Sequence, residues 1–263
     1  MDTKKPAEQP ADITIRTDEQ SSLTRIHERG ALLVGTAITK PFEFHDPDIG
    51  SLVGFDIDLV NYIAGTLDVK PEFIEMSFAN LIPALQENKV DMTIAAMYIT
   101  PDREGLVDFS VPYLDTGLVM VIQPNLINEI KSVEDLKGRK LGVKIGSTGA
   151  ELAAELNTRG YQLEISEYKD TLDSFLDLEV NRVDVIFNDY LNSLAYIKNS
   201  DSSLNIAVNE SGELIFLSNV GLGIAVRQGN KELLDIINAA LTDMNQTGTF
   251  QKISEIWLLP EVD

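Results

Sequence analysis

Short apolar segments that alternate with amphipathic segments constrain the fold of this chain more than any other feature. Residues 31–35 form an apolar run typical of a strand, and residues 55–67 carry an apolar side chain at every fourth position, as one face of a helix does. The series continues with a strand at 73–74, a helix at 81–85 and a strand at 90–97. This βαβαβ order predicts a mainly parallel sheet covered by helices.

A second alternating series follows an apolar strand at residues 117–122. Its predicted elements are strands at 141–145 and 183–187, helices at 148–156 and 172–180, a β-rich return at 214–226 and two closing helices that Gly248 separates. Two α/β lobes of about a hundred residues each suit the length of the chain. Such lobes bind ligands at the carboxyl ends of their strands, and a cleft between two lobes is a favoured ligand site.

The composition excludes several classes of function. The chain has 42 acidic and 21 basic side chains, a formal net charge of -21, so its surface would repel nucleic acid and anionic lipid. The simplest interpretation of this charge is solubility, and adaptation to high salt is the alternative. Cysteine is absent, and the two histidines, His27 and His45, are not spaced as metal ligands. We therefore predict no metal site and no cofactor.

The N-terminal segment differs from the rest of the chain. Residues 1–21 are polar, contain proline and lack the apolar core of a signal peptide, so we expect them to form a flexible tether. We also expect Met1 to stand where a leader was removed. No stretch of the sequence approaches eighteen uninterrupted apolar residues, and none is predicted to span a membrane.

Arg103 is the first candidate for ligand binding. It follows the apolar strand at 90–97 and the pair Thr100-Pro101, which can cap and begin a helical turn and so fix the direction of the arginine. A guanidinium held at the edge of a cleft can grip a carboxylate through two parallel hydrogen bonds. From spacing alone, a surface arginine paired with Asp102 or Glu104 is the favoured alternative.

Three further segments place polar or aromatic groups where a ligand could lie. Residues 144–149 run from a strand through a glycine-bearing turn into a helix, whose first amides can bind an anion, although a simple helix cap is the alternative. Asp189 follows the strand at 183–187 and could accept hydrogen bonds from an ammonium group, or could cap a turn. Phe78 could stack on a ligand, or could pack in the core.

Taken together, the short motifs of this chain resemble those of the family 3 extracellular solute-binding proteins, the polar amino-acid receptors of ABC importers. The resemblance covers about residues 23–258, and the joint order and spacing of its motifs argue against a chance match. These motifs are GFDIDL at 54–59, Phe78 with LIPAL at 81–85, ITPDR at 99–103, VDFSVPY at 107–113, LKG at 136–138, GST at 146–148, Val183-Asp184 with Asp189, and GLGI at 221–224.

The resemblance implies an α/β fold of the periplasmic-binding-protein-like type II, with two lobes joined by two hinge strands. Residues 22–114 and 215–263 would form lobe 1, and residues 115–214 would form lobe 2.

The resemblance also implies roles for individual residues. Arg103 would clamp an α-carboxylate with help from the amides of Tyr98 and Thr148, Asp189 would hold the α-ammonium, and Phe78 would stack on the ligand side chain. Ala96 and Ser147, next to these residues, would complete the binding site.

Two departures from the family pattern bear on the ligand. Family members often carry serine or threonine where this chain has Tyr98, and they tend to place an acidic residue near Thr36 and an aromatic residue near Thr39. Phe42, Phe78 and Tyr98 could together enclose an alkylated cation, as in the ectoine-binding branch of the family. Asp189 instead favours an ordinary ammonium group.

The resemblance implies that the chain captures a small zwitterion, most simply a polar amino acid, by hinge closure and delivers it to a membrane permease. A receptor for ectoine or a betaine is the alternative ligand class. An enzyme resembling a dehydratase or a sensory input domain would be other classes of protein on the same fold. Asn192, three residues beyond Asp189, cannot transfer protons, so we expect no enzyme activity. We further expect a monomer that is periplasmic or extracellular, with a lipid anchor at the outer face of the membrane as one mode of attachment.

Overall fold

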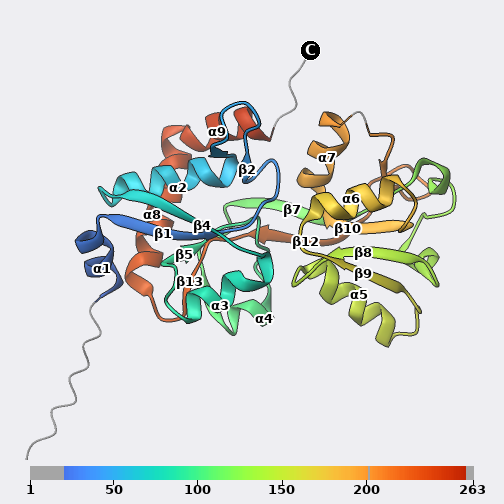
Figure 1. Cartoon of the computed structure of the whole chain (residues 1–263), viewed down its shortest axis with the longest axis horizontal. Coiled ribbons are helices and arrows are strands. Elements are labelled where there is room, and N and C mark those ends of the chain that lie inside the picture. The colour runs from blue at the N-terminus through green and yellow to red at the C-terminus, as the bar shows by residue number, and fades with distance from the viewer. Residues whose placement is uncertain (1–20, 201, 259–263) are drawn as a thin grey trace, which may run out of the picture.

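The computed structural model describes residues 21–200 and 202–258 of the chain. The predicted tether therefore lies outside the described residues except for Ser21, as do the last five residues of predicted lobe 1. The described part consists of two α/β units that lie side by side, each with its own sheet (Figure 1).

The first unit is built on a five-stranded sheet of order β4-β1-β5-β13-β6. Strands β4 and β5 run parallel to β1, whereas β13 is antiparallel to β5 and to β6. The strands are β1 (Ala31–Thr36), β4 (Lys70–Glu75), β5 (Met92–Thr93), β6 (Val107–Phe109) and β13 (Ala225–Arg227), and a separate hairpin pairs β2 (Phe44–His45) with β3 (Leu52–Val53).

Helices cover both faces of this first sheet, with α2, α8 and α9 on one side and α3 and α4 on the other (Figure 1). The predicted apolar stripe of α2 is buried, since Phe55, Leu59 and Ile63 are fully inaccessible to solvent. Gly248 separates α8 from α9 with a left-handed φ of 73°, as the sequence predicts. The helices are α1 (Ser22–Arg29), α2 (Phe55–Thr66), η1 (Phe78–Asn80), α3 (Leu81–Gln86), α4 (Pro101–Glu104), α8 (Lys231–Thr247) and α9 (Thr249–Trp257).

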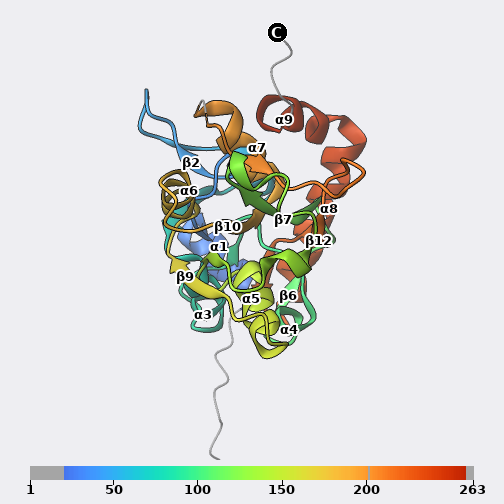
Figure 2. The same cartoon turned by 90° about the vertical axis from the view of Figure 1, so that its right-hand side faces the viewer.

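The second unit holds a six-stranded sheet of order β11-β7-β10-β8-β9, in which β12 also pairs with β7. Seen from this end of the molecule, α6 and α7 lie on one side of the sheet and α5 on the other (Figure 2). The elements are β7 (Leu114–Ile122), η2 (Pro124–Leu126), η3 (Val133–Leu136), β8 (Lys140–Lys144), α5 (Thr148–Thr158), β9 (Glu164–Tyr168), α6 (Thr171–Glu179), β10 (Val185–Asp189), α7 (Tyr190–Asn199), β11 (Asn205–Ile206) and β12 (Phe216–Leu222).

Strands β7 and β12 connect the two units (Figure 1). They pair antiparallel, from Leu114 opposite Leu222 to Val119 opposite Phe216. The lobe boundaries after residues 114 and 214 stay predictions; they lie at the start of β7 and just before β12. A two-stranded connection of this kind can bend while each sheet stays intact.

The structure differs from the sequence prediction in two details. Both sheets are mixed, because β13 and β7 add antiparallel pairs to the parallel βαβ pairs. The strand expected at 90–97 is short, since regular pairing ends after Thr93 and Ala96 adopts a positive φ of 46°. Within the described part of the chain, no helix is both long and apolar enough to cross a bilayer.

Candidate ligand-binding site

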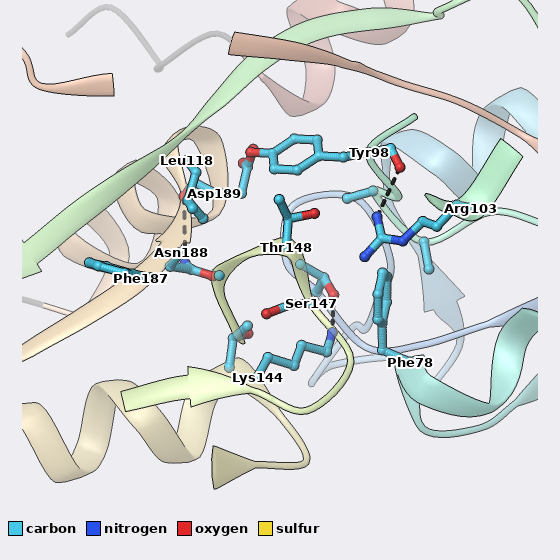
Figure 3. Close-up of a pocket in the computed structure, with 15 residues that line it drawn as sticks. Phe78, Tyr98, Arg103, Leu118, Lys144, Ser147, Thr148, Phe187, Asn188 and Asp189 are labelled. Atoms are coloured by element: carbon cyan, nitrogen blue, oxygen red, sulfur yellow. Dashed lines mark hydrogen bonds between the residues drawn. The ribbon is translucent and has the colours of Figure 1, made fainter. Parts of the chain in front are cut away.

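A pocket lies between the two units, at the carboxyl ends of β8 and β10 and beside the segment after β5 (Figure 3). Its cavity has a volume of about 60 Å³. The lining residues are Thr39, Phe78, Ala95, Ala96, Tyr98, Arg103, Leu118, Lys144, Ser147, Thr148, Gly149, Thr171, Phe187, Asn188 and Asp189.

Arg103 lies at the first-unit wall of this pocket and is 5% exposed. Its direction is fixed by α4, because the hydroxyl of Thr100 accepts a hydrogen bond from the Arg103 amide and Pro101 begins the helix. The guanidinium donates to the carbonyl of Tyr98 at 2.8 Å and to the carbonyl of Gly146, across the gap, at 3.1 Å. Burial lowers the pKa of Arg103, and the negative charge of Glu151, 3.9 Å away, opposes that shift. The expected surface pair with Asp102 or Glu104 does not form.

The start of α5 forms the wall opposite Arg103. The hydroxyl of Ser147 accepts a hydrogen bond from the amide of Ala150 at 3.2 Å, which caps the helix. The next hydroxyl, Oγ1 of Thr148, is buried without a hydrogen-bond partner among the described residues. The helix cap therefore forms at this turn, and the anion site expected there stays a prediction.

Asp189 lies at the end of β10, across the pocket from Arg103, and its Oδ1 caps α7 by accepting from the Asn192 amide at 3.0 Å. Its Oδ2 accepts from the hydroxyl of Tyr98 at 2.8 Å, and these two side chains meet in Figure 3. The same oxygen accepts from the hydroxyl of Thr116 at 2.9 Å. Burial raises the pKa of Asp189, and these hydrogen bonds oppose that shift. Burial, and then the charge of Asp189, raise the pKa of Tyr98, so the phenol remains a donor.

Eight of the ten residues predicted to bind ligand line the pocket, and Thr36 and Phe42 do not. The hydroxyl of Thr36 donates to the carbonyl of Ile94 inside the first sheet. The ring of Phe42 is fully buried and packs edge-on against Phe55 in the core under α2. The aromatic enclosure of Phe42, Phe78 and Tyr98 is therefore wrong, because the apolar core of the first unit takes up the Phe42 ring.

Sequence reasoning missed Lys144, Thr171 and Asn188 as lining residues. Lys144 is 7% exposed, donates to the hydroxyl of Thr39 at 3.0 Å and lies 5.0 Å from the centroid of the Phe78 ring. Its position at the carboxyl end of β8 is the signal that could have identified it, and Asn188 lies one residue before the carboxyl end of β10. Among the described residues, no group of acidic and histidine side chains is arranged to hold a metal ion.

Comparison with known proteins agrees with this geometry. The family model of the bacterial extracellular solute-binding proteins, family 3, matches residues 32–260. The chain belongs to this family.

Curated and structural relatives of this solute-binding protein have similar length. It is 31% identical over 245 residues to the L-cystine-binding protein TcyJ of Escherichia coli, covering 93% of this chain and 88% of that one. Among solved structures, an ancestral arginine-binding protein bound to arginine is 42% identical, with a TM-score of 0.81 and coverage of 88% and 99%. An ancestral amino acid-binding protein that is a precursor of cyclohexadienyl dehydratase is 34% identical, with a TM-score of 0.82 and coverage of 91% and 100%. These similarities confirm the two-lobed type II fold.

The solute-binding protein also buries two carboxyl groups behind the pocket, on Glu43 and Asp56. Oδ2 of Asp56 accepts from the amide of Ala96, a lining residue, at 2.9 Å and from the hydroxyl of Tyr113, beside β7, at 3.1 Å. The carboxyl of Glu43 is fully buried beside that of Asp56, and each of the two affects the pKa of the other. Burial raises the pKa of Asp56 to about 6, and burial and then Asp56 raise the pKa of Glu43 well above its usual value.

These raised pKa values predict that the protein loses stability as the pH rises. The native state holds protons that the unfolded chain releases near pH 4, so the free energy of unfolding falls from there up through the native pKa values. Glu43→Gln removes one of these ionisations. At pH 8 it should raise the melting temperature and add more than about 1 kcal/mol to the free energy of unfolding. At pH 4.5 the gain should be smaller. Melting curves against pH test this; Glu72→Gln, on the surface, is the control. An equal effect of Glu43→Gln at both pH values would contradict it.

Proposed function

We propose that this protein is the substrate-binding component of an ABC importer and captures a polar amino acid by hinge closure. The observation that carries the proposal is the approach of opposite charges from the two units to one pocket, with Arg103 on one wall and Asp189 on the other. A zwitterion carries a carboxylate that Arg103 could bind and an ammonium that Asp189 could bind. The names of its relatives, which bind cystine, arginine and glutamine, support the same class of ligand.

The binding cycle follows from which unit holds each group. In the open form, Arg103 and Phe78 of the first unit would receive the α-carboxylate and the side chain. Closure would then bring the Thr148 amide to the carboxylate and Asp189 to the ammonium. Because Tyr98 already donates to Asp189, the ammonium would displace the phenol or share the carboxylate with it. Water is excluded in the closed form, so these charge-assisted hydrogen bonds strengthen.

The partner and location of the protein are part of the same proposal. The closed shape would be recognised by a membrane permease, with the protein a monomer at the periplasmic or extracellular side, held in place by a lipid anchor where one is attached. An enzyme would need a general acid or base beside the clamp. Asp189 accepts hydrogen bonds from the amide of Asn192 and from the hydroxyls of Tyr98 and Thr116, and no histidine is among the described lining residues. This supports a binding protein rather than a dehydratase, although one structural relative is a dehydratase precursor.

A compatible solute such as ectoine or a betaine is the weaker ligand class. This ligand class was inferred from an aromatic enclosure of Phe42, Phe78 and Tyr98, but the ring of Phe42 packs in the core and does not line the pocket. The remaining rings, those of Phe78 and Tyr98, line the pocket together with a buried aspartate, which suits an ammonium with N–H donors.

A ligand screen on the intact protein tests the proposal. We expect at least one polar amino acid to raise the melting temperature, with about 2.7 kcal/mol of added stability at a hundred times its dissociation constant. Asp189→Asn should weaken that binding at least tenfold in calorimetry, because the ammonium loses its only acidic partner among the described lining residues. The exposed Asp173→Asn serves as the control. The proposal fails if betaines or ectoine bind and no amino acid does.

A further inference from the structure

Lys144 is a buried cation that the proposed binding of an α-carboxylate and an α-ammonium does not use. It is the last residue of β8, and its side chain extends from the second unit toward Phe78 (Figure 3). Arg103 lies 5.4 Å and Lys144 5.0 Å from the centroid of the Phe78 ring, so one ring of the first unit contacts both cations. The pocket thus has a second positive group near the position where a ligand side chain would lie.

The ammonium of Lys144 has few partners within the protein. It donates a hydrogen bond to the hydroxyl of Thr39 at 3.0 Å, and none of the carboxylates in the described residues comes within 4.0 Å of it. Burial lowers the pKa of Lys144, while the charges of Glu43 and Asp170 oppose that shift. An ammonium has three N–H donors, and a buried charge without acceptors is costly. An acceptor supplied by a ligand would relieve that cost.

The one carboxylate among the described lining residues is already hydrogen-bonded, whereas the Lys144 ammonium has N–H donors left over. Asp189, the only acidic residue among the described lining residues, accepts from Tyr98, Thr116 and the amide of Asn192. Oγ1 of Thr148 remains without a partner among the described residues. This balance favours a ligand with acceptors at both ends. It opposes a cationic side chain, which would lie near the Lys144 ammonium, where the described lining residues offer no carboxylate besides Asp189.

We infer that Lys144 forms a second subsite that binds the side-chain carboxylate or carboxamide of the ligand, so that the protein takes an acidic or amide amino acid and discriminates against arginine. The inference rests on the proposed function, which supplies the α-carboxylate and α-ammonium contacts. It separates this chain from its arginine-binding relatives, among them the L-arginine-binding protein of Pseudomonas aeruginosa and the ancestral arginine-binding protein.

Calorimetry of the intact protein with L-glutamate, L-glutamine and L-arginine tests the subsite. Wild-type protein should bind glutamate or glutamine at least tenfold more tightly than arginine. Lys144→Met, which keeps the length of the side chain and removes its charge, should weaken binding of that preferred ligand at least tenfold and reduce the preference over arginine. Lys140→Met, at the exposed start of the same strand, is the matched control and should change neither.

The outcomes separate the subsite from the wider proposal. A wild-type protein that prefers arginine, or a folded Lys144→Met variant that keeps its affinity and preference, would overturn the subsite and leave the receptor function standing. Failure of every amino acid to bind the wild type would overturn both. The preference of the wild-type protein for glutamate or glutamine over arginine is measured without any variant. The subsite therefore remains testable even if Lys144→Met does not fold.

Discussion

Replacing Arg103 by alanine should weaken amino-acid binding by about 2–5 kcal/mol, a loss of roughly thirtyfold to several thousandfold in affinity. The guanidinium is 5% exposed, so the carboxylate of a bound ligand would be buried with it and would lose its cationic partner. The variant would also lose the hydrogen bond from Arg103 to Gly146 that joins the two units. Isothermal calorimetry with the preferred amino acid measures the change.

Two controls make the Arg103 experiment specific. Arg103→Lys keeps the charge and loses the paired N–H geometry, so its affinity should lie between those of the wild type and the alanine variant. Arg159→Ala removes a half-exposed arginine at the far end of α5 and should bind as the wild type does. Binding by Arg103→Ala at wild-type affinity would show that the carboxylate site lies elsewhere.

Replacing Gly54 by alanine should cost about 3–5 kcal/mol of stability and lower the melting temperature by roughly 10 °C. Gly54 precedes α2 with a φ of 135°, which side-chain-bearing residues rarely adopt. An added Cβ would lie 2.2 Å from the carbonyl oxygen of Phe42, and this carbonyl accepts a hydrogen bond from the amide of Asp56. Because the obstacle is backbone, it cannot be relieved by a rotamer change.

Gly65→Ala in the same helix is the matched control for Gly54→Ala. A Cβ at Gly65 meets no atom within 4 Å, and its backbone is helical, so alanine there should add about 0.5–1 kcal/mol of stability. Thermal melts of the two variants should therefore move in opposite directions. A Gly54→Ala protein as stable as the wild type would show that the contact between the residue-42 backbone and the start of α2 is not tight.

The helix and strand order and several turn geometries could be predicted because each depends on a local pattern. The stripe of α2 has helical spacing, and residues 100 and 101 carry the chemistry that begins α4. Gly248 supplies the left-handed turn after α8. The placement of Arg103 and Asp189 at one pocket was also predicted, since the carboxyl ends of strands in an α/β lobe face the cleft and the family motifs mark those positions.

The rest depended on contacts between residues far apart in the chain, which spacing does not encode. Phe42 has a ring suited to a pocket, but the packing of α2 places it in the core. Asp189 accepts a hydrogen bond from Tyr98, ninety-one positions away, and Lys144 donates one to Thr39, 105 positions away. By itself the sequence determined two α/β lobes and a pair of opposite charges for a zwitterion. Only the tertiary structure decided which side chains are buried around that pair, because burial depends on how the two units close on each other.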